Sequence, residues 1–145
     1  MRTWAEIDLT ALEHNYRTLR AMLPRECRFL GLCKANAYGH GAAVIGHTLE
    51  RLGADMLAVA CVSEAEELRQ SGVKLPILCL GETPEELIPL LLELDVTQMV
   101  EDLETGRRLS AAAQRAGRTL RVHVKLDTGM SRLGFLWEAG REEET

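Results

Sequence analysis

The chain has 145 residues, of which 46% are hydrophobic and 27% charged, and its formal net charge is −5. These values are typical of one folded domain and exclude an intrinsically disordered chain. The negative charge argues against a nucleic-acid partner, because phosphate binding requires clustered Lys and Arg. No stretch approaches the roughly 20 apolar residues of a membrane-spanning helix, and the N-terminus does not resemble a signal peptide. We therefore expect a cytoplasmic protein without a membrane contact.

The four cysteines are scattered along the chain, and three of them lie inside apolar runs: Cys27, Cys33, Cys61 and Cys79. Their spacing matches neither a zinc site nor a disulfide framework. We therefore expect reduced, buried thiols and no metal site.

The first part of the chain predicts a strand, a helix and a second strand. Residues 3–8 roughly alternate, as in a short strand, and Thr10 with Glu13 forms the pattern of a helix-capping box. One face of the following helix is apolar: Leu12, Tyr16, Leu19 and Leu23. Pro24 should end this helix. Residues 29–33 are apolar on both faces, which is typical of a strand covered on both sides.

Directly after this strand, residues 33–41 read CKANAYGHG. Lys34 therefore sits where a rigid element meets a flexible loop, and partial desolvation there would favour a neutral, nucleophilic amine. Such an amine can form a Schiff base with a carbonyl group. Taken alone, Lys34 fits better the solvated surface charge that most lysines carry. Asn36 and His40 are expected to shape the loop by hydrogen bonds to the backbone.

The next part of the chain alternates strands and helices. Strands are predicted for residues 56–62, 76–81 and 96–100. Four helices are predicted in this part. The first ends at Gly53, the second runs from Ser63 to Gly72, the third starts at Thr83, and the fourth covers residues 103–116. Pro89 lies within the third of these helices, where a regular interior position would cost about 3 kcal/mol.

The last predicted strand, residues 120–127, carries apolar side chains on one face. The other face is polar: Arg121, His123, Lys125 and Asp127. Polar groups are costly in a plain core, so this face indicates a functional site or a wet interior. An internal ladder of salt bridges explains the same pattern equally well.

Strands that alternate with helices and short connections form successive βα units, and right-handed crossovers then make the sheet parallel. Five such strands can be counted. An eight-stranded βα barrel needs about 250 residues. The sequence therefore predicts an α/β fold that cannot complete such a barrel.

The string KANAYGHG at residues 34–41 resembles the cofactor-lysine signature of alanine racemases. These enzymes use pyridoxal 5′-phosphate on a barrel of fold type III. In that family the lysine carries the cofactor and the tyrosine four residues later contacts its phosphate, positions held here by Lys34 and Tyr38. The family often has valine where this chain has Cys33, a conservative change in size.

The string HVKLDTGMSRLGF at residues 123–135 resembles the second signature of the same family. There an arginine reaches the phenolic oxygen of the cofactor, and a lysine seven residues earlier is frequently carbamylated and braces it. Arg132 and Lys125 match these positions. A carbamate is an anion, so it would orient the arginine by a charge-assisted hydrogen bond.

The resemblance implies a partial (β/α)8 TIM-type barrel with about five parallel strands, truncated relative to the family. Residues 1–145 would be the N-terminal portion of the cofactor-binding barrel domain, without the C-terminal β-domain. The implied activity is the interconversion of L-alanine and D-alanine, which supplies D-alanine for peptidoglycan. Lys34 would be one of two bases. The second base, a tyrosine that acts across the family's homodimer interface, has no counterpart here.

We therefore expect little or no turnover from this chain alone, and association or aggregation through uncovered strand edges. The alternative is a non-catalytic remnant or a cofactor-binding module that associates with a full-length racemase. Amino-acid decarboxylases and small cofactor-homeostasis barrels share the fold type, but their lysine contexts differ from KANAYGHG.

Overall fold

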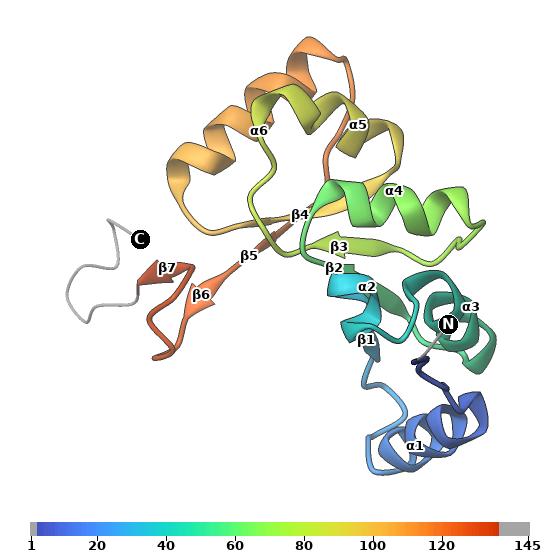
Figure 1. The fold of residues 1–145 in the computed structure, drawn as a ribbon. Coiled ribbons are helices and arrows are strands. Elements are labelled where there is room, and N and C mark those ends of the chain that lie inside the picture. Colours follow the sequence, from blue (N-terminus) through green and yellow to red (C-terminus); the bar gives the residue numbers. More distant parts are fainter. Residues whose placement is uncertain (1–2, 137–145) are drawn as a thin grey trace.

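The computed structural model describes residues 3–136, and its main feature is a parallel sheet of five strands in chain order (Figure 1). The strands are β1 (Leu30–Leu32), β2 (Met56–Val59), β3 (Ile77–Cys79), β4 (Val96–Val100) and β5 (Val122–Val124). A short parallel ladder of β6 (Leu126–Asp127) and β7 (Phe135–Leu136) follows. The predicted α/β fold with five parallel strands is confirmed.

One helix precedes the first strand, and the others lie between successive strands. The helices are α1 (Leu9–Ala21), α2 (Lys34–Tyr38), α3 (Ala42–Leu52), α4 (Val62–Gln70), η1 (Glu85–Leu87), α5 (Ile88–Glu93) and α6 (Leu103–Arg115). Helices α3 to α6 cover one face of the sheet (Figure 1). On that face Leu57, Ile77 and Cys79 are fully buried against the helices. Full burial of a Leu or Ile side chain stabilises a fold by about 1.5–3 kcal/mol, so this layer is the main core.

The opposite face of the sheet is less covered. Ala58, Leu78 and Met99 form a small separate cluster there. Leu30 and Leu32 share this face, since they pair with Met56 and Ala58, and they are 38% and 43% exposed. The expectation that the first strand is covered on both sides is therefore wrong, because both leucines keep more than a third of their surface exposed in the described chain.

The apolar side chains of the last predicted strand are exposed as well. Val122 and Val124 are 44% and 63% exposed, and they line a groove of about 360 Å³ beside α6. Helix α6 packs on Val100 of β4 and leaves the outer face of β5 open within the described residues. The predicted packing of this face is therefore not observed.

The start of the chain differs from the prediction. Residues 3–8 form no strand, and α1 is capped by Asp8, whose carboxylate accepts from the N–H groups of Thr10 (2.8 Å) and Ala11 (3.1 Å). The predicted cap at Thr10 is wrong because Asp8, two residues earlier, already satisfies the first free N–H groups. Of the predicted apolar face, Tyr16 is buried, edge-on to Phe29 with ring centroids 4.8 Å apart.

Two later helix starts also differ. Helix α4 has Cys61 as its N-cap, so Ser63 lies inside its first turn. Thr83 caps no helix; it is buried and donates to Oε1 of Gln98 at 2.7 Å. The helix predicted there is split into η1 and α5, which puts Pro89 in the first turn of α5, where no interior hydrogen bond is lost.

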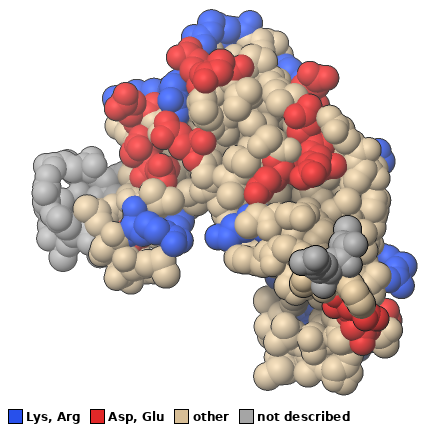
Figure 2. All heavy atoms as spheres, viewed as in Figure 1, with Lys and Arg blue, Asp and Glu red and all other residues tan. Residues whose placement is uncertain are grey.

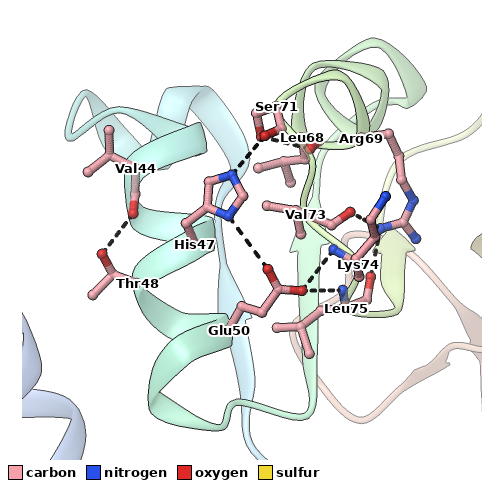
Figure 3. Close-up of polar contacts among 10 residues, drawn as sticks. All are labelled: Val44, His47, Thr48, Glu50, Leu68, Arg69, Ser71, Val73, Lys74 and Leu75. Carbon is pink, nitrogen blue, oxygen red and sulfur yellow. Dashed lines mark hydrogen bonds and ion pairs between the residues drawn. The ribbon is translucent and has the colours of Figure 1, made fainter.

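Polar contacts tie α3 to the connection between α4 and β3 (Figure 3). The Glu50 carboxylate accepts from the N–H groups of Lys74 (2.8 Å) and Leu75 (3.0 Å). The His47 ring bonds to the carbonyl of Ser71 at 2.8 Å. These contacts hold adjacent βα units in register along the helix-covered face.

The surface carries no broad basic area on the face drawn in Figure 2. Acidic side chains gather over α4 and α6, while basic ones lie in small separate groups, one of them over the β6–β7 loop. Within residues 3–136, no helix has the length and hydropathy needed to cross a membrane. The same residues contain no group of three or more acidic, His or Cys side chains placed to hold a metal ion.

The cysteines are all free. Cys33 and Cys79 are buried as expected, but Cys61 is exposed and Cys27 half-buried. The prediction of buried thiols is therefore wrong for Cys61, which lies just past the end of β2.

Candidate active site

Lys34 lies two residues past the end of β1, and backbone pairing in the sheet fixes its position. The N–H of Cys33 donates to the carbonyl of Ala58 at 2.8 Å, which continues the β1–β2 ladder up to the lysine. The Lys34 side chain is half-buried, and its Nζ lies 5.9 Å from the centroid of the Tyr38 ring, within cation–π range. The Tyr38 side chain is 59% exposed. The two residues of the first signature are therefore neighbours.

Cys33 itself is chemically quiet. It is fully buried, and burial raises the pKa of its thiol to about 11, because a thiolate would lose its hydration there.

The segment after Lys34 is a left-handed turn. Ala35, Asn36, Ala37 and Tyr38 have φ values of 51°, 53°, 52° and 54°. A left-handed conformation costs a non-glycine residue roughly 1–2 kcal/mol. Four such residues in succession persist only when surrounding contacts determine the backbone. The sequence predicts a loop here and gives no indication of this handedness.

Side chains within the segment hold the turn from one side. Asn36 Oδ1 accepts from the N–H of Ala42 at 2.7 Å, at the start of α3. His40 Nδ1 bonds to the carbonyl of Ala37 at 2.8 Å. The prediction that Asn36 and His40 shape the loop by bonding to the backbone is confirmed.

Glu64, from the first turn of α4, holds the turn from the other side. Its Oε1 accepts from the N–H of Ala35 and its Oε2 from the N–H of Ala60, both at 2.7 Å. The sequence predicts a helix start at Ser63 and gives no indication of this contact between Glu64 and the Lys34 turn. An acidic residue at the third helical position commonly reaches back to N–H groups at the start of its own helix, which accounts for the bond to Ala60 but not for the one to Ala35.

The second signature forms a loop between β6 and β7 that is organised by Asp127. Its Oδ1 accepts from the N–H groups of Gly129 and Ser131, both at 2.9 Å. These two bonds hold the pKa of the Asp127 carboxyl below its usual value, and the bond from Ser131 has the larger effect. The N–H of Phe135 donates to the carbonyl of Lys125 at 2.8 Å and closes the loop.

The two basic residues of this loop are not joined in the structure. Lys125 is half-buried, with Nζ donating to the carbonyl of Leu126 at 3.2 Å, and Arg132 is exposed. No hydrogen bond or salt bridge links them within residues 3–136. Arg121 pairs instead with Asp95 at 2.7 Å, so the ladder of salt bridges along residues 121–127 does not form in the described chain.

Both signature segments lie at the carboxyl ends of the strands, but one follows the first strand of the sheet and the other follows the last. Each follows the carboxyl end of a parallel strand, the edge where TIM-barrel enzymes place their active sites. Strands β2, β3 and β4 lie between them (Figure 1). With strand spacings of about 4.8 Å, β1 and β5 are roughly 19 Å apart along a flat sheet, and curvature brings their facing side chains closer. The structure therefore brings Lys34 and Tyr38 together but not these with Lys125 and Arg132.

A pocket of about 370 Å³ adjoins the Lys34 turn on the side of α1. Ala37 and His40 line it, whereas Lys34 and Tyr38 do not. We therefore place the candidate site at the strand ends and not in this pocket.

The sequence matches the family described as "Alanine racemase, N-terminal domain" over residues 7–143. It is 44% identical over 131 residues to an alanine racemase from Desulfovibrio desulfuricans, covering 90% of this chain and 35% of the relative. An alanine racemase from Methanococcus maripaludis is 42% identical over 140 residues, which are 97% of this chain and 38% of the relative.

Solved structures agree with these sequence matches. Alanine racemase from Clostridium difficile 630 is similar with a TM-score of 0.90 and 42% identity, over 94% of this chain and 36% of that one. The enzyme from Bacillus anthracis with bound L-Ala-P has a TM-score of 0.86 and 32% identity, over 93% of this chain and 35% of that one. The chain thus spans little more than a third of the length of these relatives.

Proposed function

This chain belongs to the alanine racemase family, and we propose that residues 1–145 form the N-terminal portion of its cofactor-binding barrel domain. The proposed activity is the pyridoxal-phosphate-dependent interconversion of L-alanine and D-alanine, which supplies D-alanine for peptidoglycan. Residues 1–145 alone should turn over little or no substrate, since they span little more than a third of the relatives. The observation that carries the proposal is the Lys34 turn, which holds an amine beside a phenol at the carboxyl edge of a parallel sheet.

The residues present fit the cofactor. Pyridoxal phosphate offers a carbonyl carbon, a phosphate and an anionic ring oxygen. Lys34 provides a half-buried primary amine for the carbonyl, and Tyr38 an exposed hydroxyl that can donate to the phosphate. Arg132 provides an exposed guanidinium suited to an anionic oxygen.

When bound, the cofactor supplies an electron-withdrawing ring that disperses the charge left at the α-carbon on loss of a proton. The Lys34 amine would accept that proton, or return it, on one face of the substrate. Its place at the end of β1 limits its reach to the strand ends, where the substrate carbon would lie. Tyr38 would hold the phosphate end in place, so that the distance from Lys34 to that carbon stays short.

Carbamylation of Lys125 stays a prediction, motivated by its seven-residue spacing from Arg132. A carbamate would orient Arg132 through a charge-assisted hydrogen bond that the unmodified amine cannot provide. Intact-mass measurement under conditions that preserve carbamates should then show one added carbon dioxide. An unmodified mass would count against it.

Several features of the whole family stay predictions for this chain: the homodimer, the cytoplasmic location, and association or aggregation of residues 1–145. The alternative function is a non-catalytic remnant, or a module that binds cofactor and associates with a full-length racemase. The exposed faces of β1 and β5 support that alternative, because they leave apolar surface for a partner.

The test of the proposal uses the three lysines of the sequence, Lys34, Lys74 and Lys125. We would mix the chain with pyridoxal phosphate, record the visible absorbance, reduce with borohydride and map the modified peptide by mass. We expect a lysine-bound band and modification at Lys34, both lost in Lys34→Ala. The control Lys74→Ala changes an exposed lysine and should behave as wild type. Equal bands in wild type and Lys34→Ala would contradict the proposal.

A further inference from the structure

Glu64 joins two segments that are far apart in the sequence. It stands in the first turn of α4, and its two carboxylate oxygens accept from N–H groups 29 and 4 residues earlier in the chain. An acidic residue at the third helical position normally reaches back to the N–H of the N-cap. Here one oxygen makes a comparable local bond, to Ala60, just before the N-cap Cys61. Helix capping therefore accounts for one oxygen and leaves the bond to Ala35 unexplained.

The bond to Ala35 acts on the residue next to Lys34. Ala35 is exposed, so water could satisfy its N–H equally well, and folding does not require a protein acceptor there. A carboxylate acceptor differs from water because it fixes the direction of the N–H and forms a stronger, charge-assisted bond. Ala35 is also the first residue of the left-handed turn, where the backbone leaves its preferred conformations.

The other bond of Glu64 anchors it to the sheet. Ala60 directly follows β2, and Ala58 of β2 accepts from the N–H of Cys33. The backbone on both sides of Lys34 is thus bonded to the same β2–α4 unit, before the lysine through Ala58 and after it through Glu64. The residues directly before and after the lysine, Cys33 and Ala35, therefore both have a fixed backbone N–H.

We propose that Glu64 is a positioning residue for Lys34, which sets the direction of the Lys34 amine by holding the Ala35 N–H and the β2–α4 connection together. This role rests on the proposed function of Lys34 as the cofactor lysine. It requires no contact between Glu64 and the cofactor. A purely structural Glu64 would change the stability of α4 and leave the chemistry of Lys34 as it is.

The experiment compares Glu64→Ala and Glu64→Gln with Glu67→Ala, which removes an exposed acidic residue of the same helix. The first readout is the apparent Kd for pyridoxal phosphate from the lysine-bound band. Losing a charge-assisted bond of this kind should weaken binding roughly ten-fold in Glu64→Ala. Glu64→Gln should weaken binding less than Glu64→Ala does, because its amide oxygen can still replace one of the two acceptors. Glu67→Ala should bind as wild type.

The second readout needs no cofactor. Brief labelling with acetic anhydride, read by peptide mass, gives the reactivity of Lys34 relative to Lys74 in the same molecule. We expect this ratio to change at least two-fold in Glu64→Ala and Glu64→Gln and to stay constant in Glu67→Ala. The ratio is measured on folded chain, so Glu64→Gln serves if Glu64→Ala does not fold.

The outcomes separate the two proposals. A wild-type chain that attaches no cofactor at Lys34 would overturn the proposed function, and the labelling ratio would still test Glu64. Wild-type attachment together with an unchanged Kd and an unchanged ratio in the Glu64 variants would overturn the positioning role alone.

Discussion

The Lys34 turn and the Arg132 loop follow the first and the last strand of one parallel sheet, yet they are held in different ways. The Lys34 turn is bonded to its neighbours: Glu64 reaches it from α4, and Asn36 connects it to α3. The Arg132 loop is bonded mainly to itself, through Asp127 and through the pairing of Phe135 with Lys125. Both present basic residues at the same edge of the sheet.

The difference follows from what lies beside each strand. Strand β1 has β2 and α4 next to it, so a side chain of the following βα unit can brace its loop. Strand β5 is the last strand of the sheet, and no βα unit follows it within residues 3–136. In the described part of the chain this loop is therefore organised mainly by bonds between its own residues. Three experiments test this contrast, and the largest effect is expected where local packing is tightest.

Gly134→Ala should disrupt the Arg132 loop most strongly. Gly134 has φ 115°, and an added Cβ would lie 2.8 Å from the Lys125 carbonyl oxygen and 2.9 Å from the Asp127 nitrogen. Backbone atoms cannot move aside cheaply, so we expect a local cost of about 3 kcal/mol or more. Amide hydrogen exchange at Phe135 should accelerate at least a hundred-fold, while the Lys34 turn keeps its protection.

The matched control for this prediction is Gly129→Ala. Gly129 also has a positive φ, 121°, but an added Cβ would meet nothing within 4 Å. It should show only the conformational strain, with a clearly smaller change in exchange. Equal effects at the two glycines would mean that backbone conformation, and not close packing, determines the loop.

Asn36→Ala should destabilise the Lys34 turn by about 1–2 kcal/mol. The substitution removes the acceptor for the Ala42 N–H at the start of α3, and alanine tolerates the left-handed conformation less well than asparagine. Urea unfolding followed by circular dichroism measures the loss. Asn36→Gly removes the same acceptor but relieves the backbone strain, so its loss should be smaller. A larger loss in Asn36→Gly would contradict the assignment of strain to this turn.

The smallest effect concerns pH. The N–H groups of Ser131 and Gly129 lower the pKa of the Asp127 carboxyl. The folded loop therefore stabilises the charged form of this carboxyl more than the unfolded chain does. The resulting stabilisation is present above the ordinary carboxyl pKa of about 4 and is lost as pH falls through the lowered pKa. Amide protection at Gly129 and Ser131, corrected for intrinsic rates, should be constant from pH 7 to 5 and decrease below about pH 4.

Asp127→Asn provides the control for this pH dependence. Its amide oxygen can still accept a hydrogen bond but does not titrate in this range. Protection should be weaker at every pH and should not change between pH 5 and 3. A decrease of the same size in Asp127→Asn would assign the pH effect to another group.

The structure agrees best with the sequence-based predictions where the hydrophobic pattern decides the structure. The strand at residues 96–100 and the helix ended by Gly53 lie where predicted, because their apolar residues pack in the core. Agreement is weaker where one side chain chooses between nearby positions, as at Asp8, which caps α1 in place of Thr10. The sequence could not indicate the exposure of Val124, because an apolar strand face predicts packing whether or not a neighbour is present.

The candidate site shows the same division. The residues of both signatures were found from the sequence, and the backbone-bonding roles of Asn36 and His40 could be derived from their chemistry. The left-handed conformation of residues 35–38 could not, because non-glycine residues disfavour it. The bond from Glu64 to Ala35 could not either, because it joins segments 29 residues apart. Local propensity contains no information about such contacts.

The burial of Cys33 has a consequence for chemical selectivity. The sequence places a thiol and an amine side by side, and both groups can add to an aldehyde. The thiol is fully buried with its pKa raised to about 11, whereas the amine next to it is half-exposed at the strand end. Near neutral pH the sheet thus offers an incoming carbonyl compound one partner, and the neighbouring sulfur is protected from oxidation and from competing adducts.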